Sequence, residues 1–148
     1  MTINKLTGSR IVAEARAWIG TPYIHQASIK HVGCDCLGLV RGIWRELVGE
    51  EPQATPAYSS GWAETGGREE LFAAANAHFD LIDKTKPVAG DLLLFRLRSK
   101  SPAKHLGIYT GKNHFIHAYD GSSVVESSMS EFWWRRVDSA FRFPGVSI

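Results

Sequence analysis

Residues 33–40 of the chain read Gly33-Cys34-Asp35-Cys36-Leu37-Gly38-Leu39-Val40, and the fold can be worked out from this stretch. It opens the clearest helical pattern in the sequence, because apolar residues recur at helical spacing and a glycine follows the last turn. Those residues are Cys36, Leu39, Val40, Ile43, Trp44 and Leu47, and the glycine is Gly49. Asp35 stands at the N-cap position, where a short carboxylate accepts hydrogen bonds from the free N–H groups of the first turn. The pattern therefore predicts a helix that begins at Cys36 and buries the face carrying this cysteine.

The position of Cys36 at a helix start has chemical consequences. The free N–H groups and the positive end of the helix dipole favour a thiolate, which is a strong nucleophile. Gly38, two residues on, leaves room for another backbone segment to come close. We therefore interpret Cys36 as a candidate nucleophile; the alternative is a small buried hydrophobe. Cys34 is the rival nucleophile, but it lies before the N-cap, outside the influence of the dipole.

Two histidines later in the chain could serve such a thiol. His105 opens the strand-like run at 105–109, and His117 lies in the next such run, at 115–118. A histidine at a strand end can act as a base toward Cys36 and then protonate a leaving amine. A hairpin joining the two runs would bring His117 close enough to orient the His105 ring, the role of the third group in a catalytic triad. The alternatives are an exposed strand start for His105 and a buried structural histidine for His117. A cysteine followed by two strand-borne histidines suggests a cysteine hydrolase.

Length and composition limit the possible classes. A chain of 148 residues is about one domain in length, and a hydrophobic content of 44% is enough for a sizeable core. We expect a single domain over residues 1–148. The net charge of +2 is too small to indicate a nucleic-acid partner. Two cysteines separated by one residue form no disulfide framework. Neither a secretory signal nor an apolar run of membrane-spanning length is visible, so we expect synthesis in the cytoplasm.

The remaining pattern places helices before strands. We expect a first helix over residues 9–19 with Ser9 as its N-cap, an irregular loop over 23–33, a surface loop over 50–67 and a third helix over 68–79. Short strands are expected at 91–97, 105–110, 114–119, 122–127 and 141–143. This order predicts an α+β fold in which N-terminal helices pack on a C-terminal antiparallel sheet.

Other candidate motifs have simpler readings. Cys-x-Cys with scattered histidines lacks the paired close spacing of zinc ligands, so we expect no metal and no cofactor. Gly90-Asp91-Leu92-Leu93 reads as a structural turn into a buried strand. The aromatic run Phe132-Trp133-Trp134 could be core, a partner surface or a sugar-stacking patch, and we favour core or a partner interface.

Taken together, the sequence resembles the NlpC/P60 family of cell-wall peptidases. The resemblance spans roughly residues 9–143 and rests on five signatures in the same order. They are Gly20-Thr21-Pro22-Tyr23, Asp35-Cys36-Leu37-Gly38-Leu39-Val40, Gly90-Asp91-Leu92-Leu93, His105-Leu106-Gly107-Ile108-Tyr109 and Phe115-Ile116-His117-Ala118. Within the family, the run over residues 34–42 is most similar to the phage-type subgroup that occurs with tail genes of phages and gene transfer agents.

The resemblance implies a papain-like α+β fold and a thiol peptidase. It makes Cys36 the nucleophile, His105 the base and His117 the third, orienting residue, while Tyr23 matches a tyrosine that lines the site. We expect Tyr23 and Asp35 to contact substrate. Family members typically cut the bond between γ-D-glutamate and a diamino acid in peptidoglycan stem peptides.

Two departures from the family pattern bear on substrate preference. Leu37 stands where many members have serine, and Ile24-His25-Gln26 replaces a frequent pair of small glycines. The subgroup implies phage-like tail or baseplate proteins as partners, and a protein carried in a virion-like tail that acts on the cell wall. The alternatives are an amidase or acyltransferase with the same catalytic set, and a non-catalytic structural piece of a tail tip.

Overall fold

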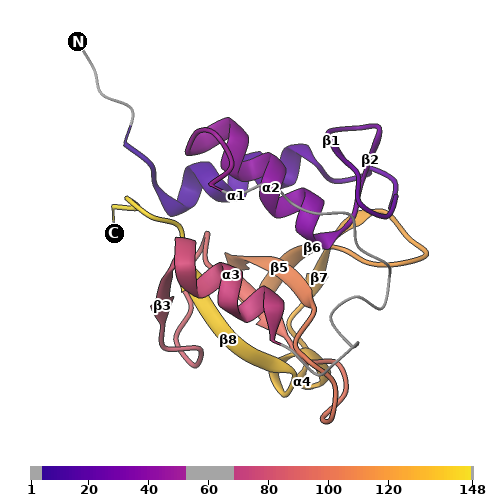
Figure 1. The fold of residues 1–148 in the computed structure, drawn as a ribbon, viewed down its shortest axis with the longest axis vertical. Helices are drawn as coiled ribbons and strands as arrows, with labels where there is room; N and C mark the ends of the chain where they lie inside the picture. The colour runs from indigo at the N-terminus through magenta and orange to yellow at the C-terminus, as the bar shows by residue number, and fades with distance from the viewer. Residues whose placement is uncertain (1–4, 53–68, 148) are drawn as a thin grey trace.

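The computed structural model describes residues 5–52 and 69–147. Its helices are α1 (Gly8–Ala17), α2 (Cys36–Leu47), α3 (Glu70–His78) and α4 (Glu131–Trp134). Its strands are β1 (Ser28–Ile29), β2 (Gly33–Cys34), β3 (Asp80–Ile82), β4 (Leu92–Phe95), β5 (His105–Gly111), β6 (His114–Ala118), β7 (Val124–Ser128) and β8 (Val137–Arg142). In Figure 1 the N-terminal helices lie together on one side of the strands contributed by the second half of the chain. The predicted α+β fold is confirmed.

Strands β3 to β8 form one antiparallel sheet in the order β3-β8-β4-β5-β6-β7. The last strand of the chain, β8, pairs with β4 near the middle of the sheet, so the C-terminal segment is central to the fold. All five predicted strands are present, with ends that differ by a few residues. Strand β3 was not predicted, because its three residues are mostly exposed and show no apolar alternation.

The central strand β4 is buried on both faces of the sheet. Along β4, Leu92 and Leu94 point into a large core shared with α1, α2 and α3, while Leu93 and Phe95 point into a smaller core beneath Trp133 and Trp134 of α4. All four β4 side chains are therefore buried. A strand that is apolar on both faces has a continuous hydrophobic run in its sequence, as Leu92-Leu93-Leu94-Phe95 does.

Helix α2 begins at Cys36 with Asp35 as its N-cap, as predicted. Helix α1 differs from the prediction. Its N-cap is Thr7 and not Ser9, because the Thr7 hydroxyl accepts from the Arg10 N–H at 3.2 Å and the Thr7 carbonyl accepts from the Ile11 N–H. Thr7 and Ser9 have equivalent capping chemistry, so only the backbone path could decide between them.

The segment before α2 is more ordered than predicted. In place of an irregular loop over 23–33, β1 and β2 form a short antiparallel hairpin that leads directly to Cys36. Strands of two residues are too short for a hydrophobic pattern to show in the sequence. Most of the expected surface loop over 50–67 lies outside the described residues, as does Arg68 at the start of the third predicted helix. No helix in the described ranges is long and apolar enough to cross a membrane.

Close backbone packing explains the glycine at position 38. A Cβ atom at Gly38 would lie 1.9 Å from the carbonyl oxygen of Ala27, in the connection that precedes β1. The first turn of α2 can approach this segment only because residue 38 has no side chain, as the sequence indicated.

We predict that Gly38→Ala lowers the free energy of unfolding by about 1–3 kcal/mol, because overpacking against a backbone atom outweighs the better helix propensity of alanine. Urea denaturation followed by circular dichroism measures this. Glu46→Ala, at an exposed position of the same helix, is the control and should change stability by no more than about 0.5 kcal/mol. Equal stability of the two variants would show that the Ala27 segment moves aside without cost.

Candidate active site

Cys36 and His105 line the same cavity. This cavity has a volume of about 550 Å³ and lies between the start of α2, the start of β5 and the turn after β6. Tyr23, Asp35 and Tyr119 also line it. Cys34 is fully buried and is not among the lining residues. Of the two cysteines, Cys36 is therefore the one that a substrate in the cavity could reach.

The thiol of Cys36 lies beside the start of β5. Its Sγ is 3.6 Å from the carbonyl oxygen of Lys104, the residue directly before His105, and donates a hydrogen bond to it. Backbone N–H groups of Leu37 and Leu106 also point toward the sulfur. The helix start and the strand start thus meet at the thiol.

The two histidines are joined by a hydrogen bond, as the hairpin model predicted. Nε2 of His105 lies 2.8 Å from Nδ1 of His117, and both residues are buried. Strand alternation puts them on one face of the sheet, because Leu106 and Ile116 belong to the core on the opposite face. The bond uses Nε2 of His105, which leaves its Nδ1 as the nitrogen available to a thiol.

Ser127 continues this chain of polar groups and was not found from the sequence. Its Oγ lies 3.0 Å from Nε2 of His117. If His117 donates from Nε2 to Ser127, its Nδ1 accepts the proton of His105 Nε2, and His105 Nδ1 is then unprotonated and basic. The distances are therefore consistent with one tautomer for each ring. A serine in a short strand has no local signal for such a role, since only the pairing of β6 with β7 brings it to His117.

Aromatic side chains enclose the histidine pair. The ring of Trp133 lies 5.7 Å from that of His105 and 5.2 Å from that of His117, and Tyr119 lies 5.6 Å from both. Trp133 packs against the smaller core, so for this residue the prediction that the run 132–134 is core or a partner interface is confirmed. These rings exclude water from the imidazoles.

The other two predicted site residues differ in what they do. Tyr23 lines the cavity, and burial raises the pKa of its hydroxyl, so it stays protonated. The Asp35 carboxylate accepts hydrogen bonds from the N–H groups of Gly38 at 2.7 Å and Gln26 at 2.8 Å. Because both oxygens of Asp35 bind its own chain, the geometry gives it a structural role at the helix start. Contact with substrate stays a prediction for both residues.

The electrostatics of the cavity differ from the expectation that the helix start favours a thiolate. Burial, and to a lesser degree the nearby Asp35 carboxylate, raise the pKa of Cys36 to about 12, although backbone N–H groups partly oppose this. Burial also lowers the pKa of His105 to about 3, with a contribution from His117, and that of His117 to about 4. The direction of these pKa shifts favours a neutral thiol and neutral imidazoles, because desolvation opposes the charged forms.

Burial of the neutral histidines predicts a stability that falls on acidification. Unfolded histidines bind protons near pH 6.5, whereas the folded rings stay neutral to about pH 4 and 3. The unfolded state therefore binds more protons below pH 6.5, and stability is lost by up to about 1.4 kcal/mol per pH unit for each ring. Denaturant unfolding between pH 7 and 5, above the range where carboxylates titrate, should show a shallower slope for His105→Gln than for the wild type. Equal slopes would contradict this.

The described residues contain no group of three or more His, Cys, Asp or Glu side chains arranged to hold a metal ion. The chemistry that the arrangement supports is that of a thiol, a base and an orienting ring. Covalent catalysis by a cysteine with an adjacent general base requires these groups.

The sequence and the fold of this chain are similar to those of known proteins. A model of the NlpC/P60 family matches residues 20–142. The chain is 34% identical over 129 residues to the murein DD-endopeptidase MepS/murein LD-carboxypeptidase of Escherichia coli K12, and the match covers 86% of this chain. It is 31% identical over 139 residues to the gamma-DL-glutamyl hydrolase of Bacillus subtilis, over 93% of this chain. The chain spans 58% and 30% of the lengths of these two relatives.

Among solved structures, the crystal structure of the NlpC/p60 domain of the peptidoglycan hydrolase SagA is similar. The TM-score is 0.68 at 28% identity, and the match covers 93% of this chain and 100% of that chain. The family model covers most of the chain, the two relatives exceed 30% identity, and the fold is the same, so the chain belongs to the NlpC/P60 family.

Proposed function

We propose that this protein is a thiol peptidase that hydrolyses peptidoglycan stem peptides, with the bond between γ-D-glutamate and a diamino acid as its target. The observation that carries the proposal is the meeting of Cys36 and His105 in one cavity, with the His105 ring hydrogen-bonded to His117. The names of the two curated relatives, a murein endopeptidase and a gamma-glutamyl hydrolase, support the substrate class and the γ-glutamyl bond.

In the proposed reaction, the Cys36 sulfur attacks the carbonyl carbon of the scissile amide as its proton moves to Nδ1 of His105. The backbone N–H of Cys36 at the helix start binds the oxygen that becomes negative. The His105 imidazolium then protonates the amine nitrogen, the C–N bond breaks and a thioester remains. Water attacks the thioester, gives its proton to His105, and releases the acid with the thiol restored.

The neutral resting pair suits this sequence of steps. Charge separates only when the sulfur bonds to the substrate carbon, so the transfer of the thiol proton and the attack are coupled. The role of His117 is to hold the His105 ring in one tautomer, with Ser127 doing the same for His117.

The first experiment is mass spectrometry of purified sacculi and defined stem peptides after incubation with wild type, Cys36→Ala and Cys34→Ala. We expect a γ-D-glutamyl–diamino acid cut from wild type and from Cys34→Ala, because Cys34 lies outside the cavity. Cys36→Ala should make no cut. Cleavage by Cys36→Ala would rule out this nucleophile. Cuts only at another bond would refute the assignment of the γ-D-glutamyl bond, and no cut by wild type would refute the proposal for the free chain.

We expect substitutions along the hydrogen-bond chain to lower kcat by progressively smaller factors from His105 to His117 to Ser127. We expect kcat to fall by about 10²–10⁴ for His105→Ala, which removes the general base. His117→Ala should cost less and Ser127→Ala least, since each acts on His105 only through the ring before it. Steady-state kinetics on a soluble stem peptide measures this order, and a loss at Ser127→Ala as large as at His105→Ala would contradict it.

For the setting of this activity, we propose a phage-like tail that carries the enzyme to the cell wall. The similarity of residues 34–42 to the phage-type subgroup supports this. Immunogold labelling of particles released by the source cells tests it, and label confined to cell envelopes with none on tails would refute it.

A further inference from the structure

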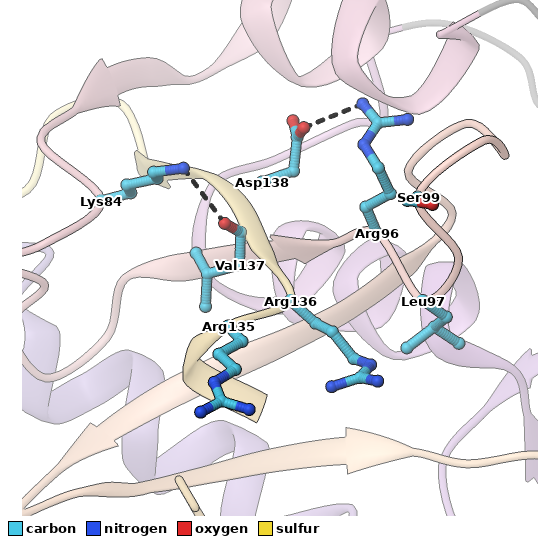
Figure 2. Close-up of a pocket in the computed structure, with 8 residues that line it drawn as sticks. All are labelled: Lys84, Arg96, Leu97, Ser99, Arg135, Arg136, Val137 and Asp138. Atoms are coloured by element: carbon cyan, nitrogen blue, oxygen red, sulfur yellow. Dashed lines mark hydrogen bonds and ion pairs between the residues drawn. The ribbon is translucent and has the colours of Figure 1, made fainter. Parts of the chain in front are cut away.

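A second hollow of about 480 Å³ lies away from the cysteine, where α4 leads into β8. Its lining includes Lys84, Arg96, Leu97, Arg135, Arg136 and Asp138, which we call the basic groove. Figure 2 shows these side chains together, with the ends of Arg135 and Arg136 extending in the same general direction as Leu97. A smaller neighbouring hollow of about 300 Å³ shares Lys84, Arg135 and Val137 with it, so the two form one extended surface.

The basic groove has more positively than negatively charged side chains. Four cationic side chains line it against one carboxylate, that of Asp138. Arg96 is already paired, to Asp138 at 2.8 Å and to Glu69 at 3.1 Å. Within the described part of the chain, Lys84 and Arg136 form no ion pair; the Lys84 ammonium donates only to the Val137 carbonyl at 3.3 Å. The groove therefore keeps unneutralised positive charge in a concave surface, which concentrates the field.

The guanidinium of Arg136 is held in a fixed position by contacts with Phe132. Its guanidinium lies 3.7 Å from the centre of the Phe132 ring, and its Nη1 donates to the Phe132 carbonyl at 2.8 Å. A guanidinium fixed by stacking loses less freedom when it binds a carboxylate, and its remaining N–H groups match a carboxylate in a fork geometry. Arg135 is engaged only in an exposed pair with Glu131, one helical turn away, which is weak and opens readily.

The basic groove adjoins the catalytic cavity. Leu97 lines both hollows, so the two lie next to each other at this residue. A γ-linked glutamate leaves its α-carboxylate free, and peptide ends add more carboxylates. We propose that the basic groove is a second subsite that binds carboxylates of the peptidoglycan peptide extending from the cleavage cavity. The proposal rests on the proposed function for the identity of the ligand.

Binding can be separated from cleavage with the inactive Cys36→Ala protein. We measure how much of this protein co-sediments with purified sacculi. Comparing intact sacculi with sacculi whose carboxylates have been amidated by carbodiimide gives the contribution of those carboxylates to binding. We compare this protein with and without Lys84→Gln/Arg136→Gln. The control pair Lys86→Gln/Lys112→Gln removes the same charge from two exposed lysines that do not line the groove.

The groove variant should bind intact sacculi about three- to tenfold more weakly, as expected for two exposed charge contacts. The control pair should bind as well as the parent, and amidation should weaken the parent but not the groove variant further. The proposal would be overturned if both double variants lost binding equally, or if amidation did not weaken binding of the parent protein. Unchanged binding of the parent to amidated sacculi would point to phosphate groups of attached polymers. If wild type fails to cut peptidoglycan while the groove dependence holds, only the proposed function is lost.

Discussion

The carboxylate of Asp35 joins two pieces of chain directly beside Cys36, the proposed nucleophile. One oxygen caps α2 through the Gly38 N–H, and the other binds the Gln26 N–H in the segment before β1. The absence of a side chain at Gly38 lets this segment lie against the helix. The position of Cys36 relative to β5 depends on this junction, because a helix that began one residue earlier or later would turn the thiol away from Lys104 and His105.

Burial sets the protonation state of the site. The aromatic rings around His105 and His117 keep water out, and the same desolvation holds the thiol and both imidazoles neutral. A thiolate–imidazolium pair stabilised in advance would need a wetter or more cationic cavity. In the proposed reaction, charge would develop only when the sulfur attacks a substrate carbonyl.

The four-residue helix α4 contributes to both sites. Trp133 covers the histidine pair, while Arg135 and Arg136, which follow directly, line the basic groove. The segment between β7 and β8 thus contributes an apolar cover to the histidine pair and cationic side chains to the basic groove. Leu97 lies between the two hollows, so the proposed cleavage cavity and the proposed carboxylate subsite are neighbours on the surface.

Local patterns in the sequence were sufficient for α2, its Asp35 cap and the strands, because helical and strand periodicities are written in neighbouring residues. The same holds for Gly38, where a glycine in a first turn indicated close backbone packing. The nearness of His117 to His105 followed from a hairpin, which is also a local structure. The N-cap of α1, the β1–β2 hairpin and β3 were wrong or missed, since equivalent capping residues and very short strands carry no distinguishing pattern.

The amino-acid sequence by itself determined the fold class, the helix start that carries Cys36 and the two strands that carry His105 and His117. Only the tertiary structure decided that Ser127 continues the histidine chain, that Trp133 covers it, and that burial raises the pKa of the thiol. The physical reason is the distance along the chain over which each effect acts. Local hydrogen bonds and periodicity involve residues that are near neighbours in the chain. Desolvation and the electric field depend on everything that surrounds a group in space, including segments far away in sequence.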